Sequence, residues 1–261
     1  MSRKSIREAF ESGKAFIPFV TCGDPNLETT AALVRELANE GASVIELGIP
    51  FSDPTAEGPV IQEANIRSLS QGTTTDDVFA LVAELRNGDE PVECPLVVMT
   101  YANVVYHYGT ERFCENAAKA GIDGIILPDV PFEEKDEFAG ACRDNGLVLI
   151  SMIAPTSEER IAMIASEAEG FVYLVSSLGV TGMRSSFNAD LEGIVRRIKQ
   201  STDTPVAIGF GISNPEQAKA MSQIADGVIV GSAIVKQVAE HGDSSPKVIG
   251  AYAREMINAI R

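Results

Sequence analysis

The chain has 261 residues, 45% of them hydrophobic, which is enough to bury one large core and suits a single α/β barrel. Its 21 basic and 37 acidic residues give a net charge of −16, so we expect no nucleic acid partner. No apolar run approaches the length of a membrane span, and the basic start lacks the apolar core of an export signal. The cysteines are scattered without paired spacing, which predicts reduced thiols in a cytoplasmic protein.

In chain order, a short amphipathic helix is predicted first, over residues 2–12, with Ile6 and Phe10 at helical spacing to plug one end of the fold. Strands are then predicted at residues 15–21, 42–47, 95–100, 124–128, 147–153, 170–175, 205–209 and 226–231. Helices are predicted at residues 27–40, 60–87 with a break near Gly72, 111–120, 133–145, 157–166, 190–200, 214–223, 233–240 and 246–260. This alternation predicts an α/β fold, a single-domain (β/α)₈ TIM barrel over residues 1–261, with a doubly wound sheet as the alternative.

Residues 44–59, VIELGIPFSDPTAEGP, join a buried strand to a restrained acidic loop. Glu46 lies in the apolar strand, where lost hydration would raise its pKa and suit it to acid/base chemistry. From the strand alone, a glutamate bonded to backbone or an arginine is an equally good interpretation. The loop favours the catalytic one, because its prolines and glycines fix the backbone around Asp53 and Glu57 more than a simple connection needs.

Glycine turns follow the last two predicted strands. The backbone N–H groups of Gly211, Gly231 and Ser232 are predicted to hold one phosphate, with a helix dipole behind them. Either turn alone is a weak signal, since tight turns often have this composition. The Gly- and Ser-rich segment 176–188 is predicted to be a lid over this site, with Gly182 within reach of the phosphate, and a plain connector is the alternative.

Other catalytic chemistries have little support. Every lysine falls on a predicted helix or outer loop, which disfavours a Schiff-base aldolase. His107 and His241 lie far apart in the chain, so a zinc site or a histidine dyad is not expected, and each is predicted to be a surface residue. What remains is carboxylate chemistry. The candidates after strand ends are Glu46, Asp53, Glu57 and Asp129, with Tyr101 and Tyr173 as hydroxyl partners.

Six segments, in order and spacing, resemble the α subunit of tryptophan synthase: PFVTCGDPN, ELGIPFSDPTAEGP, GIILPDVPFEE, YLVSSLGVTG, IGFGIS and VGSAIV. The resemblance runs from about Phe16 to Ile234. It implies cleavage of indole-3-glycerol phosphate to indole and glyceraldehyde 3-phosphate without a metal or organic cofactor. It also implies a partner β subunit, which contains PLP and uses the indole to make tryptophan, in an α₂β₂ complex.

By this resemblance Glu46 is the main acid/base, Glu57 the group at the indole nitrogen, and Tyr173 a hydroxyl near the reacting carbon. Substrate binding is assigned, from the resemblance and the turns above, to Phe19, Tyr101, Thr181, Gly182, Phe210, Gly211, Gly231 and Ser232. The loop that meets the β subunit in the family contains Asp53, Pro54 and Thr55.

The chain departs from the family at two positions in this loop. The family normally has leucine and aspartate where this sequence has Thr55 and Glu57. Glutamate keeps the charge but adds a methylene, and a shift of about 1 Å in a catalytic group can cost on the order of 100-fold in rate. The alternative function is therefore a catalytically weak α-like subunit that mainly binds and activates a β subunit.

Overall fold

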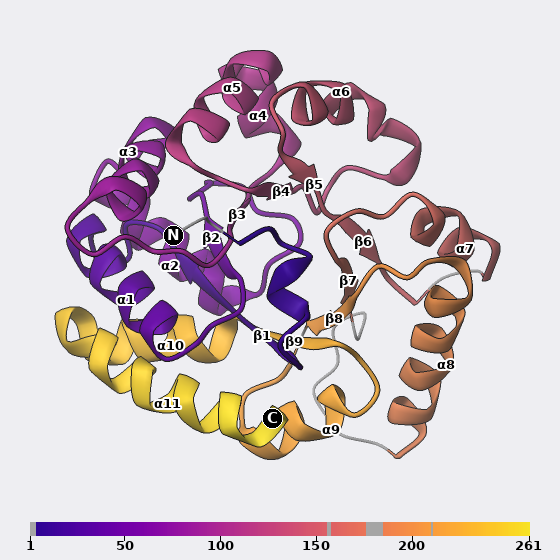
Figure 1. Ribbon diagram of the computed structural model, residues 1–261. Helices are drawn as coiled ribbons and strands as arrows, with labels where there is room; N and C mark the ends of the chain where they lie inside the picture. Colours follow the sequence, from indigo (N-terminus) through magenta and orange to yellow (C-terminus); the bar gives the residue numbers. More distant parts are fainter. Residues whose placement is uncertain (1–3, 156–157, 176–184, 210) are drawn as a thin grey trace.

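Short parallel strands alternate with helices around a barrel, which Figure 1 shows roughly along its axis. The computed structural model describes residues 4–155, 158–175, 185–209 and 211–261. The strands are β1 (Ala15–Thr21), β2 (Ile45–Gly48), β3 (Leu96–Met99), β4 (Gly124–Ile126), β5 (Val148–Leu149), β6 (Ser151–Ile153), β7 (Val172–Val175), β8 (Val206–Gly209) and β9 (Gly227–Val230). The helices are α1 (Leu27–Asn39), α2 (Pro59–Ser70), α3 (Thr75–Asn87), α4 (Ala102–Tyr108), α5 (Thr110–Ala120), α6 (Asp136–Asp144), α7 (Glu158–Ser166), α8 (Ser185–Ser201), α9 (Pro215–Ser222), α10 (Ser232–His241) and α11 (Ser245–Ile260). Three 3₁₀ turns complete the described elements: η1 (Glu8–Phe10), η2 (Phe132–Glu134) and η3 (Gly242–Ser244).

The strand order β5-β4-β3-β2-β1-β9-β8-β7-β6 begins and ends with segments that are neighbours in the chain. Only Ile150 separates β5 from β6; β5 pairs with β4, and β6 pairs with β7. The predicted strand 147–153 is therefore two short pieces that together take the fifth position in the barrel. All of the pairings are parallel, and the predicted (β/α)₈ barrel is confirmed.

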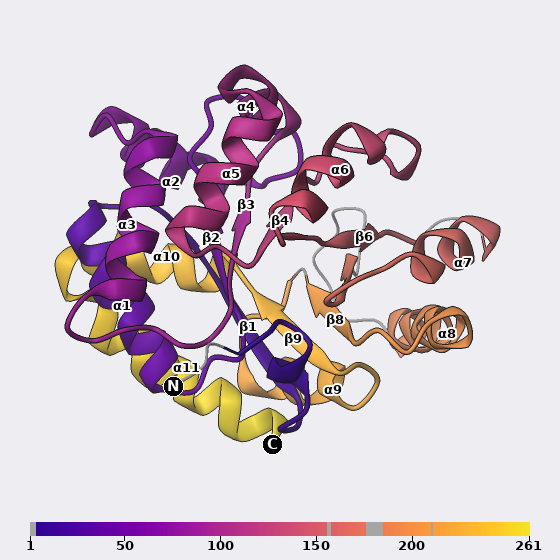
Figure 2. The same cartoon turned by 45° about the horizontal axis from the view of Figure 1, so that its top comes forward.

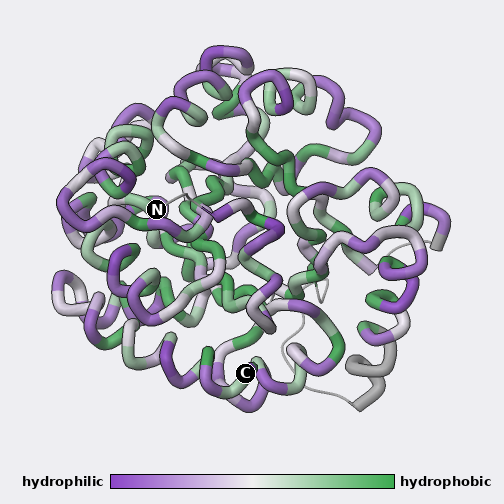
Figure 3. Tube along the Cα trace, in the orientation of Figure 1, coloured by the Kyte–Doolittle hydropathy of each residue, from purple (hydrophilic) through white to green (hydrophobic). Residues whose placement is uncertain are grey.

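Alternation along the strands divides their side chains between two apolar cores. Ile17, Val97 and Ala207 belong to a cluster inside the barrel, while their neighbours Phe16 and Val98 belong to the larger cluster under the helices. Because both faces are buried, the strands need apolar residues at successive positions. Figure 3 shows the result as hydrophobic strands surrounded by helices of mixed character. Among the described helices, none has the length and apolar character needed to cross a bilayer.

The start of the chain closes the end of the barrel where the strands begin. Ile6 and Ala9 are buried in the inner cluster, and the rings of Phe10 and Phe171 lie 5.8 Å apart. Glycines where the strands begin make room for these side chains: a Cβ on Gly124 would lie 3.1 Å from Ile6. Figure 2 shows this indigo turn at the lower end of the strands.

The predicted plug is present, but the helix predicted over residues 2–12 is wrong for the part that the structure describes. Only Glu8–Phe10 form a regular turn, of the 3₁₀ type. Ser5 and Glu8 exchange hydrogen bonds that close this turn, and Gly13, at φ 129°, redirects the chain into β1. A longer helix would carry the chain past the start of the strand.

Replacing Ile6 by alanine should lower the free energy of unfolding by about 2–5 kcal/mol, because it leaves a cavity between glycines that cannot fill it. Urea unfolding of the isolated chain measures this. Ile66→Ala is the matched control, since Ile66 is 65% exposed and its truncation should change stability by less than about 0.5 kcal/mol. Equal losses in the two variants would contradict a plug that supports the barrel.

Candidate active site

Glu46 lies inside the barrel, near the end where the parallel strands finish. It is on β2, paired with Phe19 of β1 and Val97 of β3, and it is fully buried. Neither carboxylate oxygen has a hydrogen-bond partner among the described residues, so the alternative of a glutamate bonded to backbone or an arginine is not observed there. Burial raises the pKa of Glu46 to about 8. The structure therefore gives Glu46 the burial and the raised pKa that the sequence predicts, and its role in proton transfer stays a prediction.

Tyr173 and Phe19 are packed close to this carboxyl by two glycines. Burial and the charge of Glu46 raise the pKa of Tyr173 well above its usual value, which keeps its hydroxyl protonated. A Cβ on Gly209 would lie 2.6 Å from the Tyr173 ring, and one on Gly48 would lie 2.6 Å from the Phe19 ring. Glycine is required at both positions for these rings to occupy the barrel mouth.

Glu57 lies on the loop between β2 and α2 and is half-buried. Its carboxylate accepts a 2.8 Å hydrogen bond from Asn65, and its backbone carbonyl accepts a 2.7 Å bond from Gln62. The Tyr101 hydroxyl accepts a 3.2 Å bond from the Ala56 N–H. Burial raises the pKa of Glu57, while its contacts with Asn65 and Tyr101 oppose that shift. The loop therefore holds its second acid in a defined position.

The predicted phosphate turns belong to the same rim as Glu46. Gly211 follows β8 at φ +76°, and Gly231 follows β9 and begins α10, whose first residue is Ser232. A Cβ on Gly231 would lie 3.6 Å from Phe19, the residue paired with Glu46. The first turn of a helix presents N–H groups and a positive dipole end to an anion. The geometry thus suits a phosphate beside the buried acid.

The remaining predicted residues have different outcomes. Asp53 and Thr55 are exposed and Pro54 is partly buried, so the structure puts these residues at the surface. Asp129 is exposed, and its two carboxylate oxygens share a hydrogen bond from the Ala102 N–H at the start of α4, which is a structural role. Thr181, Gly182, Phe210 and most of the predicted lid lie outside the described residues.

Sequence reasoning missed the polar face of α2. Asn65 and Ser68 are buried; Asn65 bonds Glu57, and Ser68 donates 2.6 Å to the Cys22 carbonyl. Arg67 donates two 2.8 Å bonds to the buried carboxylate of Asp24. The sequence did contain a signal for this face: Asn65 and Ser68 are polar, lie three positions apart on the predicted helix, and adjoin the apolar Ala64.

The assembled site suits proton transfer. It combines the buried carboxyl of Glu46, whose pKa is about 8, with the half-buried carboxylate of Glu57 on a hydrogen-bonded loop. The protonated hydroxyl of Tyr173 is the third group. Over the described ranges no group of three or more His, Cys, Asp or Glu side chains is arranged to hold a metal ion. His107 and His241 are both exposed, as the sequence predicts.

Comparison with known proteins assigns this barrel to a family. The family model described as tryptophan synthase alpha chain matches residues 7–259. The chain belongs to the tryptophan synthase alpha chain family. It is 47% identical over 264 residues to the tryptophan synthase alpha chain of Shouchella clausii, covering 98% of this chain and 97% of that one. It is 48% identical to the Lactiplantibacillus plantarum alpha chain, covering 96% and 94% of the two chains.

Solved structures agree with this assignment. The tryptophan synthase subunit alpha of Legionella pneumophila superposes with a TM-score of 0.88 at 38% identity, over all of this chain and 98% of that one. A Mycobacterium tuberculosis tryptophan synthase structure gives a TM-score of 0.88 at 33% identity, over 100% and 99% of the two chains. The family resemblance inferred from the six sequence segments is therefore confirmed.

Replacing Glu46 by glutamine should remove a pH dependence of stability. Between pH 4.5 and about 8 the folded chain keeps the Glu46 proton that the unfolded chain releases, so folding becomes less favourable as pH rises. The wild-type chain should lose about 1.4 kcal/mol per pH unit from this group across that window. Urea unfolding of both proteins from pH 5 to pH 8 measures the difference in slope. Identical slopes would contradict a buried Glu46 that holds its proton.

Proposed function

We propose that this chain is the α subunit of tryptophan synthase, acting as a single (β/α)₈ domain in the cytoplasm. Its reaction would be the cleavage of indole-3-glycerol phosphate to indole and glyceraldehyde 3-phosphate. The observation that carries the proposal is Glu46, a fully buried carboxyl that has no hydrogen-bond partner among the described residues and has a pKa of about 8. Such a group has appreciable populations of both protonation states at neutral pH, as general acid/base catalysis requires.

The reaction moves protons at the indole ring and at the side-chain hydroxyl. Glu46 first gives its proton to the ring carbon that bears the side chain, while the nitrogen loses its proton to Glu57. The Glu46 carboxylate then takes the proton of the side-chain hydroxyl; a carbonyl forms, the carbon–carbon bond breaks, and its electrons return to the ring. Glu57 returns the proton to nitrogen, so both acids end as they began.

The other site residues would position the substrate. Phe19 and Tyr173 would enclose the indole beside Glu46, and their packing against Gly48 and Gly209 supports this assignment. The turns at Gly211 and Gly231, with Ser232 at the start of α10, would hold the phosphate. From the family resemblance, Thr181, Gly182 and Phe210 would complete the pocket.

We further propose that the α reaction uses no metal or organic cofactor, and that PLP belongs to a partner β subunit in an α₂β₂ complex. The exposed Asp53 and Thr55, with the partly buried Pro54, form the predicted docking loop. Two large apolar side chains support a partner on this side: Ile66 of α2 is 65% exposed and Tyr106 of α4 is 75% exposed. The Glu57 loop is held from both places, by a hydrogen bond from Asn65 of α2 to Glu57 and by one from the Ala56 N–H to Tyr101, the residue just before α4.

Glu46→Gln keeps the shape of the side chain and removes its titration. Indole release from indole-3-glycerol phosphate, with β subunit present, should fall by at least ~100-fold. Glu255→Gln, at an exposed position on α11, is the matched control and should retain the wild-type rate. Near-normal turnover by the Glu46 variant would remove Glu46 from the mechanism.

Glu57→Asp tests whether the chain is a competent enzyme or a weak α-like subunit. We expect the rate to change by less than about tenfold, under ~1.4 kcal/mol of barrier, because Asn65 and Tyr101 hold the longer acid. Asn65→Ala should lower the rate, whereas Gln62→Ala, which loses a bond to the backbone carbonyl of Glu57, should have a smaller effect.

A gain of several orders of magnitude in Glu57→Asp, over a parent rate at background, would overturn the enzyme assignment. The chain would then be mainly a binding and activating subunit. Complex formation with the β subunit, measured by light scattering, separates this outcome from a misfolded variant.

A further inference from the structure

Two cysteines meet on the outside of the barrel, far along the chain from Glu46. Cys114 lies on α5 and Cys142 on α6, both are buried, and their Sγ atoms are 3.8 Å apart. Cys22 and Cys94 are also free thiols. The proposed lyase reaction uses neither thiol.

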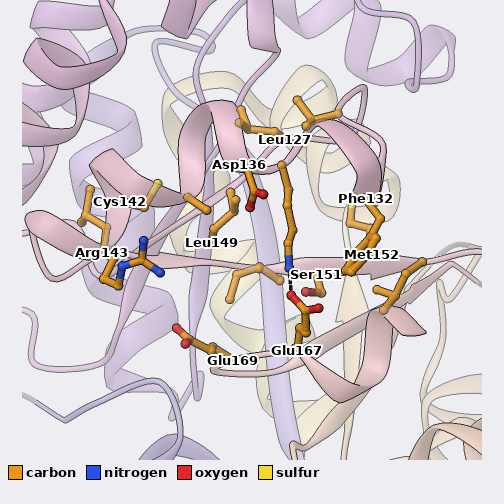
Figure 4. A pocket seen from close by; sticks show the side chains of 16 residues that line it. Leu127, Phe132, Asp136, Cys142, Arg143, Leu149, Ser151, Met152, Glu167 and Glu169 are labelled. Carbon is orange, nitrogen blue, oxygen red and sulfur yellow. Dashed lines mark hydrogen bonds and ion pairs between the residues drawn. The ribbon is translucent and has the colours of Figure 1, made fainter. Parts of the chain in front are cut away.

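Cys142 also lines a cavity of about 390 Å³ between α6 and α7, outside the fifth position of the sheet. Figure 4 shows Cys142 and Arg143 at one side of it, with Glu167 and Glu169 below them. Lys135, which also lines the cavity, forms an ion pair with Glu167. A cavity of this size admits a molecule as small as hydrogen peroxide. The buried thiol can therefore meet an oxidant without unfolding of the barrel.

We propose that Cys114 and Cys142 are a modification site, a dithiol that hydrogen peroxide converts to a disulfide joining α5 to α6. The separation of 3.8 Å would close to the ~2.05 Å of an S–S bond with a movement of roughly 0.9 Å by each sulfur.

The reaction balances with peroxide as the only oxidant. Peroxide transfers one oxygen to the Cys142 sulfur, giving a sulfenic acid and one water. The Cys114 sulfur then attacks that sulfur and expels the oxygen as a second water. Two thiols and one peroxide thus give one disulfide and two waters, and two electrons pass from the sulfurs to the O–O bond.

The position of the cross-link gives it a structural effect. It would join the helices before and after β4, next to the place where β5 and β6 supply only two and three paired residues. A disulfide here closes a loop that includes β4 and the segment carrying Asp129. Closing this loop restricts the unfolded chain and should stabilise the folded one.

Peptide mapping tests the proposal on the intact wild-type chain. The folded protein is treated with hydrogen peroxide, free thiols are alkylated before unfolding, and trypsin is added. The expected product is FCENAAK (residues 113–119) linked to DEFAGACR (residues 136–143), abolished by a reductant. In a sample that is not alkylated, the number of free thiols titrated in denaturant should fall from four to two. The midpoint of thermal unfolding should rise by about 5 °C.

Serine variants make the assignment specific. Cys114→Ser and Cys142→Ser should each abolish the linked peptide and the rise in thermal midpoint, while Cys94→Ser, the matched control, should retain both. The proposal is wrong if the folded chain gives only peroxide-oxidised single thiols, if Cys22 or Cys94 takes part in the link, or if the linked peptide forms only in urea. Because mapping uses the wild-type chain, a variant that fails to fold does not affect the result.

Discussion

The burial of one unpaired carboxyl is the constraint on which the rest of the structure depends. Glu46 has no hydrogen-bond partner among the described residues, and the loss of hydration on burial raises its pKa. Such a group favours exposure to water, so the surrounding structure must hold it in place. β2 does so because it is paired on both sides, with Phe19 and Val97 fixing the register of Glu46. The apolar cores inside and outside the barrel offset the cost of this burial.

Glycines make room for larger side chains at both ends of the barrel. Where the strands begin, Gly124, Gly170 and Gly227 leave room for Ile6 and Phe10, and the space is filled by apolar side chains. Where the strands end, Gly48 and Gly209 leave room for the Phe19 and Tyr173 rings beside Glu46. The chain's own residues fill the end where the strands begin, so the buried Glu46 carboxyl lies closer to the opposite rim. That polarity is what a barrel needs to bind substrate at the ends of its strands.

Most of the fold was predictable, because its signals are local. Buried strands read as short apolar runs, and helix starts such as Thr74 with Asp77 form capping boxes within three residues. The features that sequence reasoning missed depend on distant partners. Helix α4 begins at Ala102, whose N–H bonds Asp129, and Asn65 acquires its role only by facing Glu57. The break at Ile150 depends on pairing with different strands on either side. Glu46 was recognisable because its apolar neighbours are adjacent in sequence, whereas the contacts that hold Glu57 come from two other elements.

Those contacts connect three successive loops at the rim. Asp129, after β4, bonds the first N–H of α4; Tyr101, just before α4, bonds the Ala56 N–H after β2; and Ala56 adjoins Glu57. A displacement of α4 would therefore change both the position of Glu57 and its burial, which is the cause of its raised pKa. Tyr106 on α4 and Thr55 on the loop are exposed beside this network. A partner that packs against them would act on the second acid through contiguous hydrogen bonds, and Glu46, held in its strand, would remain in place.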